Sequence, residues 1–292
     1  MSNIGTIVTA MITPFDARGN CNLPEAQRLA RWLVERGNDG LVVAGSTGEG
    51  MTLNSQERNA LIRAVKEAVG DRASVIANTG TSDTRSSVTA AAEAEGAGAD
   101  AVLVVVPPYS KPPQSGMLAH FGAVADSVAL PLLVYNIPGR TAANMLPDTL
   151  LELARRHRNV AGVKESSGDL NQIATIVRDR SEGFVVFSGD DYLFLPSLSV
   201  GADGVVGVAS HLCSREYRKL FDAFRNGDVA AAASIHHKLL GLMNALFTVS
   251  NPIPVKWAMN QFGFNVGNAR APLDAFPEGM AESLRPLLAA YA

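Results

Sequence analysis

The sequence has few cysteines, no long apolar segment and no excess of either charge. Its two cysteines, Cys21 and Cys213, lie far apart and form neither a CxxC motif nor a spacing typical of metal ligands, so we expect free thiols. No apolar run reaches the roughly 18 residues that a membrane helix needs. The N-terminal segment lacks the basic stretch and apolar core of a signal peptide. We therefore expect no membrane partner and a cytoplasmic location.

The charge of the chain argues against nucleic acid as a partner. The 292 residues include 25 basic and 28 acidic side chains, and the two signs are mixed along the chain. A net charge of −3 without a basic patch gives no electrostatic footprint for nucleic acid. With 47% hydrophobic residues, the chain is long enough to bury one large core, as a globular protein does.

Short apolar runs rich in β-branched residues alternate with longer amphipathic stretches up to about residue 226. The runs are continuous, as expected of parallel strands that are buried on both faces. Asn54 and Asp169 stand where two of the helical patterns begin and are N-cap candidates. The predicted strands are 6–12, 40–44, 74–78, 101–106, 132–136, 160–164, 184–188 and 204–208, and the predicted helices include 24–36, 55–69, 115–128 and 170–180.

Eight strands that are each followed by a helix predict an α/β fold of the (β/α)8 TIM barrel type. An open, doubly wound sheet is the alternative, although such sheets rarely reach eight regular units in this length. Beyond Asn226 the strand signal ends, residues 228–248 form a long Ala/Leu-rich helical pattern, and two more helical stretches end at Tyr291. We therefore predict a catalytic barrel over residues 1–226 and a C-terminal helical extension, an appendage packed on it, over residues 227–292.

Lys164 is the most informative of the polar residues at the predicted strand ends, where the active site of such a barrel forms. It alone of the six lysines ends a buried strand. Burial disfavours the charged form of a lysine, and the neutral amine can attack a carbonyl to form an imine. The alternative is a structural ion pair with Glu49 or Glu165, and position alone leaves both open.

Two other strand ends carry groups that suit imine chemistry. Tyr135 lies one strand away and could be the acid and base that an imine needs, or an ordinary core tyrosine. Ser46 and Thr47, between glycines, could offer hydroxyl and N–H groups to a small carboxylate, or form a plain turn. Arg140, in a Pro-Gly-Arg-Thr turn, could clamp a carboxylate or lie at the surface.

The sequence gives little indication of a metal site. Asp190 and Asp191 are adjacent, so their side chains diverge, and His211 is the nearest histidine at a strand end. His236 and His237 have no ligand spacing. We therefore expect neither a metal nor a cofactor, and we interpret Asp190 as the cap of the seventh helix.

Five motifs together resemble the dihydrodipicolinate synthase/N-acetylneuraminate lyase superfamily, and the resemblance covers essentially the whole chain in order. Within the superfamily the chain is most similar to the 4-hydroxy-tetrahydrodipicolinate synthases. The discriminators are the Asn251–Lys256 segment and Arg140, because sialic acid lyases typically lack an arginine at the position of Arg140. The motifs are Gly45-Ser-Thr-Gly-Glu49, Tyr135-Asn-Ile-Pro-Gly-Arg-Thr141, Gly162-Val-Lys-Glu165, Ser188-Gly-Asp-Asp191 and Asn251-Pro-Ile-Pro-Val-Lys256.

This resemblance implies a reaction and a role for each site residue. Lys164 would form an imine with pyruvate, and the derived enamine would attack aspartate 4-semialdehyde on the route to diaminopimelate and lysine. Tyr135, Thr47 and Tyr109 would form a proton relay, with Tyr109 supplied by a neighbouring subunit of a homotetramer that is a dimer of dimers. Arg140 would hold the semialdehyde carboxylate. Ser46 and Val206 would also line the substrate site.

Two positions depart from the family pattern and keep other functions open. Ser46 stands where the synthases usually have threonine, and Pro108 interrupts a common Pro-Tyr-Tyr sequence before Tyr109. The alternatives are another pyruvate-dependent aldolase or 2-keto-acid dehydratase of the superfamily, acting on sialic or sugar 2-keto acids. A more remote alternative is a non-catalytic barrel that binds a small acid, against which the complete set of Lys164, Tyr135, Thr47 and Tyr109 argues.

The resemblance also bears on regulation. Lysine-inhibited members hold lysine in an interface pocket through polar and aromatic side chains. Pro108 has neither the ring nor the hydroxyl of the usual tyrosine, Ser86 lacks the usual carboxylate, and Arg58 adds a positive charge. We therefore expect lysine to inhibit weakly or not at all. The matching positions in this chain are Ser55, Arg58, Ser82, Ser86 and Pro108.

Overall fold

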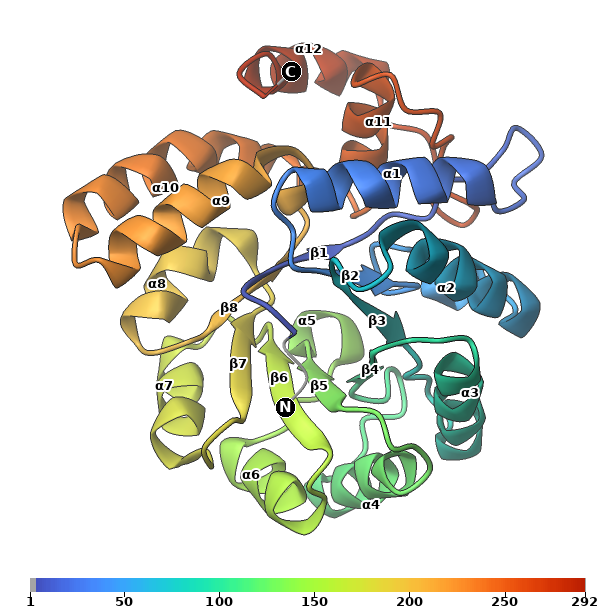
Figure 1. Ribbon diagram of the computed structural model, residues 1–292, viewed down its shortest axis with the longest axis vertical. Helices are drawn as coiled ribbons and strands as arrows, with labels where there is room; N and C mark the ends of the chain where they lie inside the picture. Colours follow the sequence, from blue (N-terminus) through green and yellow to red (C-terminus); the bar gives the residue numbers. More distant parts are fainter. Residues whose placement is uncertain (1–3, 292) are drawn as a thin grey trace.

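The computed structural model describes residues 4–291. Residues 1–3, part of the N-terminal segment considered for a signal peptide, and residue 292 lie outside this range. Eight parallel strands close into a barrel in chain order, and β8 pairs back with β1 (Figure 1). This closure confirms the predicted (β/α)8 barrel and excludes the open sheet. The strands are β1 (Ile7–Ala10), β2 (Gly40–Val43), β3 (Ser74–Asn78), β4 (Ala101–Val105), β5 (Leu132–Asn136), β6 (Val160–Glu165), β7 (Val185–Ser188) and β8 (Gly204–Gly207).

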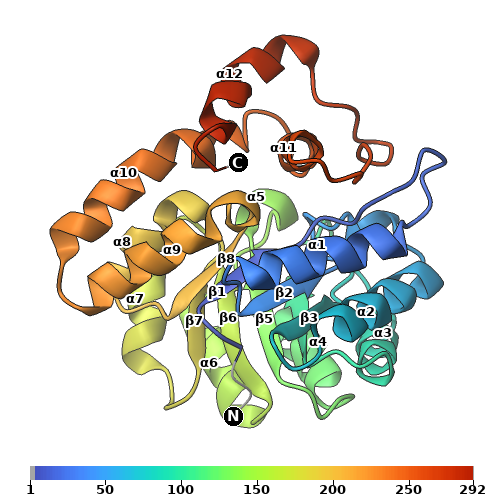
Figure 2. The ribbon, with the colours of Figure 1, turned by 45° about the horizontal axis from the view of Figure 1, so that its top comes forward.

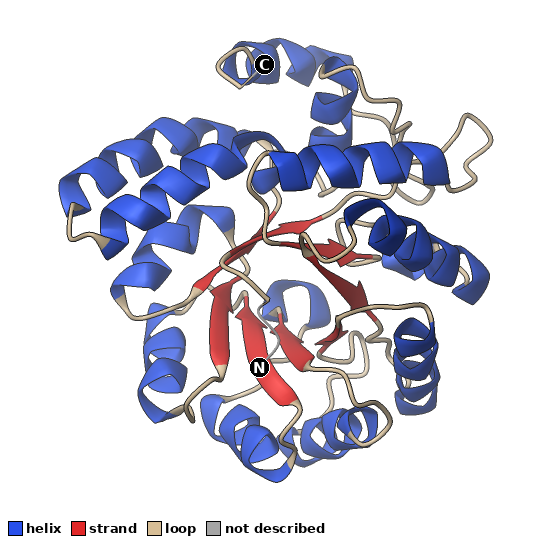
Figure 3. Ribbon diagram, in the orientation of Figure 1, coloured by secondary structure: helices blue, strands red, loops and turns tan. Residues whose placement is uncertain are grey.

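Helices surround the strands (Figure 3). Asn54 caps α2 through a reciprocal pair of hydrogen bonds with Glu57, and the Asp169 side chain accepts from the first N–H groups of α7, so both predicted caps are confirmed. The helices are α1 (Leu23–Glu35), α2 (Ser55–Val69), α3 (Thr84–Gly96), α4 (Gln114–Ala125), α5 (Pro138–Thr141), α6 (Pro147–Arg156), α7 (Leu170–Asp179), α8 (Phe194–Ser199), α9 (Ser210–Arg225), α10 (Val229–Ala245), α11 (Ile253–Gln261) and α12 (Glu278–Leu288), with the 3-10 turns η1 (Gly50–Thr52) and η2 (Asp191–Leu193).

The predicted elements match the observed ones except at their ends. The first strand is shorter than predicted, because it stops at Ala10, and β6 runs one residue further, to Glu165. Such differences are ordinary at element ends, where the ladder hydrogen bonds stop. None of the helices within residues 4–291 combines the length and the apolar character that a bilayer span requires.

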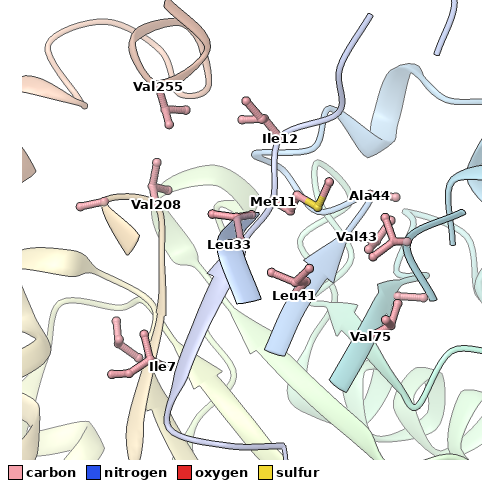
Figure 4. Close-up of a cluster of buried hydrophobic side chains, with 14 of the residues drawn as sticks. Ile7, Met11, Ile12, Leu33, Leu41, Val43, Ala44, Val75, Val208 and Val255 are labelled. Atoms are coloured by element: carbon pink, nitrogen blue, oxygen red, sulfur yellow. The ribbon is translucent and has the colours of Figure 1, made fainter. Parts of the chain in front are cut away.

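Side chains of alternate strand residues divide the core into two apolar clusters. One lies inside the barrel and includes Tyr135, Phe187 and Val206. The larger one fills the space between the strands and the helices, and it continues into the C-terminal helices. Val255 of α11 points toward Ile12 and Val208, at the ends of β1 and β8 (Figure 4).

The C-terminal helices lie along the side of the barrel and over one of its ends. α10 packs beside α9, whereas α11 lies over the end of the barrel from which α5 also projects (Figure 2). Because α5 follows the C-terminal end of β5, this is the end at which a barrel of this type carries its active site. The extension is therefore placed to contact the site.

Candidate active site

Lys164 lies near the C-terminal end of β6 and is only 5% exposed. It is the direct neighbour of Tyr135 in the pairing of β5 with β6, and its Nζ atom lies 4.2 Å from the centre of the Tyr135 ring. Within residues 4–291, no ion pair or hydrogen bond involves this amine. The amine therefore has no ion-pair or hydrogen-bond partner among these residues, and in its neutral form it can react with a carbonyl group.

The alternative interpretation of Lys164, as half of an ion pair with Glu49 or Glu165, is wrong. Glu49 pairs with a different lysine. Glu165 follows Lys164 directly on the strand and so points to the opposite face. Its carboxylate accepts hydrogen bonds from Asn136 Nδ2, at 3.0 and 3.1 Å, and from Gln172 Nε2, at 3.0 Å. Burial raises the pKa of Glu165, although these hydrogen bonds oppose the shift.

The loop after β2 holds Thr47 at the C-terminal end of the strands. Thr47 is 3% exposed and Ser46 beside it is half-buried. Asn251, which begins the segment leading into α11, donates a hydrogen bond from Nδ2 to Thr47 Oγ1 over 2.9 Å. Because the Thr47 oxygen accepts this bond, the hydroxyl proton of Thr47 remains free to be donated to another group.

A buried ion pair holds the same loop. Glu49 Oε1 lies 2.7 Å from Lys256 Nζ, and the two side chains are 0% and 1% exposed. Glu49 Oε2 accepts from the backbone N–H of Arg270. Burial lowers the pKa of Lys256, and Glu49 opposes that shift. Gly50 permits the turn, because a Cβ atom there would lie 1.9 Å from the Ala44 carbonyl oxygen.

The roles of Asn251 and Lys256 were not predicted from the sequence. Both lie in a motif that supported the family resemblance, but no role followed from their residue types. The one local signal was Lys256 within the apolar stretch of α11, which suggests a buried amine with a partner elsewhere. The extension, which was predicted to pack on the barrel, contacts the loop that carries Thr47.

The remaining predicted site residues occupy three different environments. Val206 is 1% exposed and lies with Tyr135 inside the barrel. Arg140, on α5, is exposed, and its Nη2 atom lies 3.4 Å from the carbonyl oxygen of Asn251. Tyr109 is 95% exposed and has a left-handed backbone, with φ of +72°. Within residues 4–291, no hydrogen bond joins Tyr109 to the other predicted site residues.

Asp190 and Asp191 differ from their predicted roles. Asp190 precedes η2, but its side chain makes no capping hydrogen bond, so the predicted cap is wrong. Burial raises the pKa of Asp190 to about 6, although the nearby Lys164 lowers it. Asp191 instead accepts from the N–H groups of Val208 and Ala209 and fixes the loop after β8. Within residues 4–291, no cluster of His, Cys, Asp and Glu is arranged to hold a metal ion.

His211 is fully buried beside this loop as a neutral ring. Its Nε2 atom accepts from the N–H of Ile12 over 3.1 Å, and its Nδ1 atom lies 2.8 Å from the carbonyl oxygen of Val208. The first contact requires an unprotonated Nε2, and the second requires a proton on Nδ1. Burial lowers the pKa of His211 to about 4, against the ordinary value of 6.5.

His211 should make the protein less stable in acid. Between pH 6.5 and pH 4 the unfolded chain binds a proton at this residue and the folded chain does not, so stability falls as pH falls. The contribution is on the order of 3 kcal/mol. Urea unfolding at pH 7 and pH 4.5 should show a smaller loss for His211→Gln than for the wild type. The exposed control His237→Gln should keep the wild-type loss, and equal losses in all three would contradict the assignment.

Comparisons of the sequence and of the structure with known proteins identify the same family. The model of the "Dihydrodipicolinate synthetase family" matches residues 3–291. A 4-hydroxy-tetrahydrodipicolinate synthase from Parasynechococcus marenigrum is 48% identical, over 98% of this chain and 95% of the relative, and one from Bacillus subtilis is 46% identical over 97% of each. A crystal structure of dihydrodipicolinate synthase from Bacillus anthracis has a TM-score of 0.97 and 38% identity, covering 100% of both chains. A structure of the enzyme from Cyanidioschyzon merolae, described as having lysine bound, has a TM-score of 0.97 and 41% identity, covering 99% of this chain and 98% of that one. The chain belongs to the dihydrodipicolinate synthetase family.

Proposed function

We propose that the protein is a 4-hydroxy-tetrahydrodipicolinate synthase, which condenses pyruvate with aspartate 4-semialdehyde. The observation that carries this proposal is the buried, unpaired amine of Lys164 against the ring of Tyr135. The names of the full-length relatives give the product, and the family resemblance implies the pair of substrates. No cofactor is needed, because the iminium ion that Lys164 forms with pyruvate is the electron sink that the reaction requires.

Lys164 and Tyr135 would carry the first half of the reaction. The amine attacks C2 of pyruvate, and the resulting carbinolamine loses water to give an iminium ion. Loss of a proton from the methyl group then gives an enamine. The Tyr135 hydroxyl, next to Lys164 on the neighbouring strand, supplies and removes the protons.

Thr47 and Ser46 would hold the pyruvate carboxylate and extend the proton path, and Val206 would line the floor of the site. The Thr47 hydroxyl suits both tasks. Its oxygen accepts the hydrogen bond from Asn251, which fixes its position, and its proton can therefore be donated to another group. The enamine then attacks the aldehyde carbon of the semialdehyde. The amino group of the semialdehyde then displaces the Lys164 amine from C2 of the former pyruvate. This exchange closes the ring and releases the product from the enzyme.

Tyr109 would complete the relay in a neighbouring subunit rather than in its own. Its side chain is 95% exposed and its backbone is left-handed, a conformation that tyrosine adopts only at a cost. An exposed aromatic ring held in this way suits insertion into a partner. We propose a cytoplasmic homotetramer built from two such dimers, with barrel 1–226 as the catalytic unit and residues 227–292 as an extension that supports the β2 loop.

The function is tested with a panel of substrates. Purified protein is incubated with pyruvate and either aspartate 4-semialdehyde or another aldehyde, and cleavage of sialic and sugar 2-keto acids is measured in parallel. Condensation with the semialdehyde should exceed every other activity. Preferred cleavage of a sugar acid would identify a different pyruvate aldolase, and pyruvate binding without any turnover would identify a binding protein.

Replacing Arg140 with alanine should separate the two substrates. The rate at which pyruvate and borohydride together label Lys164 through the imine should stay near that of the wild type. In contrast, kcat/KM for the semialdehyde should fall about tenfold to hundredfold, since a charge-assisted contact to its carboxylate is lost. Arg155, exposed on α6, provides a matched control, and Arg155→Ala should change neither rate. An unchanged kcat/KM for Arg140→Ala would show that the assigned role is wrong.

Lysine should inhibit the protein weakly or not at all. Arg58, Ser82 and Pro108 line one hollow of about 340 Å³ that also contacts Ser46, and Arg58 Nε has no hydrogen-bond partner within residues 4–291. A guanidinium in this hollow repels a cationic ligand. Initial rates at subsaturating pyruvate should stay constant as lysine is added. Half-inhibition below about 1 mM, an affinity of about 4 kcal/mol, would contradict this expectation.

A further inference from the structure

Glu165 is a buried carboxylate that the reaction described above does not use. It is the last residue of β6, directly after Lys164, and it is 2% exposed. Within residues 4–291 it forms no ion pair. Burying a carboxylate without a cationic partner destabilises the folded protein unless hydrogen bonds from neighbouring groups compensate. The groups that donate to Glu165 therefore show what it holds in place.

Four hydrogen bonds reach the Glu165 carboxylate from three residues. Asn136 Nδ2, at the end of β5, donates to both oxygens, over 3.1 and 3.0 Å. Gln172 Nε2, on α7, donates over 3.0 Å, and the backbone N–H of Ser167 donates over 2.7 Å. Asn136 is 1% exposed and Gln172 is 6% exposed, so these bonds form away from water. The carboxylate thus ties the end of β6 to β5 and to α7.

The same bonds belong to a closed ring of four side chains. Asn136 Nδ2 also donates to Asn144 Oδ1 over 2.7 Å, and Asn144 Nδ2 donates to Gln172 Oε1 over 3.0 Å. Gln172 returns to Glu165, which closes the ring. Asn136 Oδ1 accepts from the backbone N–H of Met145 over 2.9 Å, so the ring also holds the segment between α5 and α6. Glu165 is the one member of this ring that accepts hydrogen bonds without donating any.

This ring lies directly behind the two residues that are proposed to carry the imine chemistry. In the pairing of β5 with β6, Tyr135 is opposite Lys164, and the next pair is Asn136 opposite Glu165. Successive side chains of a strand point to opposite faces, so the first pair faces the inside of the barrel and the second faces the helices. The Lys164 amine has no hydrogen bond or ion pair within residues 4–291. Its place 4.2 Å from the centre of the Tyr135 ring therefore depends on how the two strand ends are held.

We propose that Glu165 is a positioning residue, whose carboxylate fixes from the outer face of β6 the strand end that presents Lys164 to Tyr135. The proposal rests on the imine with pyruvate proposed above. Glu165 faces away from the inside of the barrel and acts through its hydrogen bonds to Asn136 and Gln172 rather than on the reacting atoms. A displacement of about 1 Å between reacting groups can slow a reaction about a hundredfold. Loss of this carboxylate should therefore appear in the rate of imine formation.

A single and a double substitution test this role. Glu165→Gln keeps the size of the side chain but places an NH2 group among groups that also donate. The rate at which saturating pyruvate and borohydride label Lys164, per folded molecule, should fall about tenfold. The pyruvate concentration for half of the maximal rate should change less than about threefold, because Ser46 and Thr47, which are proposed to hold the pyruvate carboxylate, lie on the β2 loop.

Asn136→Asp combined with Glu165→Gln exchanges the donor and the acceptor of the pair. The new amide on β6 can donate to the new carboxylate on β5, and it can still accept from Gln172. Labelling should therefore recover to within about threefold of the wild-type rate. Should Glu165→Gln not fold, Gln172→Met takes its place. It removes only the donor on α7, and we expect a fall of about threefold.

Asn159→Ala is the matched control, at the other end of the same strand. Asn159 directly precedes β6, and its Nδ2 atom donates to three carbonyl oxygens of residues 125–130, over 2.8, 3.0 and 3.4 Å. Its loss should lower Tm, because buried hydrogen bonds are removed, and should leave the labelling rate of the folded molecules unchanged. A residue with a purely structural role is expected to behave in this way.

The results separate this inference from the proposed function. A wild type in which pyruvate does not label Lys164 overturns both, whereas a wild type that is labelled but does not condense the semialdehyde overturns the proposed function alone. With a labelled wild type, a wild-type rate in Glu165→Gln, or in Gln172→Met in its place, overturns the role of Glu165. So does a folded double variant that is labelled as slowly as Glu165→Gln, or an equal slowing in Asn159→Ala.

Discussion

Lys256→Met is expected to destabilise the protein by about 3–5 kcal/mol, the cost of leaving a buried charge without its partner. Glu49 is 0% exposed, and Lys256 Nζ, 2.7 Å from its carboxylate, is its ion-pair partner. Lys256 Nζ also donates to the carbonyl oxygen of Asn268, so the substitution removes a second contact. Urea unfolding at pH 7 measures the difference.

Two further variants show whether the buried charge causes the loss. Lys256→Met combined with Glu49→Gln removes both charges and should recover part of the stability. Lys219→Met removes an exposed lysine of α9 and should change stability by less than about 0.5 kcal/mol. A loss below about 1 kcal/mol in Lys256→Met would show that the pair does not hold the β2 loop.

Lys164→Met, in contrast to Lys256→Met, is expected to abolish activity without lowering stability. Turnover should fall at least about a thousandfold, because no other side chain can replace the amine that forms the imine. Stability should stay the same or rise, since no ion pair or hydrogen bond within residues 4–291 depends on the Lys164 amine. The measurements are the rate of condensation and the midpoint of urea unfolding.

The comparison of the two lysine variants is itself informative. Both lysines are buried, but of the two only Lys256 forms an ion pair with a carboxylate, whereas Asp190 lies near Lys164 without such a contact. We therefore expect one substitution to remove stability and the other to remove chemistry. Residual turnover of Lys164→Met above about one per cent of wild type would require a different nucleophile.

The barrel and the place of Lys164 in it could be predicted from the sequence because their signals are local. Continuous apolar runs mark strands that are covered on both faces, and a lysine at the end of such a run must lie in the site of a barrel. The capping residues Asn54 and Asp169 were predicted for the same reason, because a cap acts within one turn of its own helix.

The contacts around the β2 loop could not be predicted, because they join residues far apart in the chain. Lys256 reaches Glu49 and Asn251 reaches Thr47 only when α11 folds over the barrel end. Asp190 was misassigned because a favourable residue type at a helix start does not ensure that its side chain turns toward the helix.

Trapping the imine tests the central claim most directly. The wild-type protein is incubated with pyruvate, reduced with borohydride, digested and examined by mass spectrometry. The mass of one reduced pyruvyl group should appear on the peptide that contains Lys164, and it should be absent from Lys164→Ala. An adduct on Lys256, or labelling that persists in Lys164→Ala, would contradict the proposed mechanism.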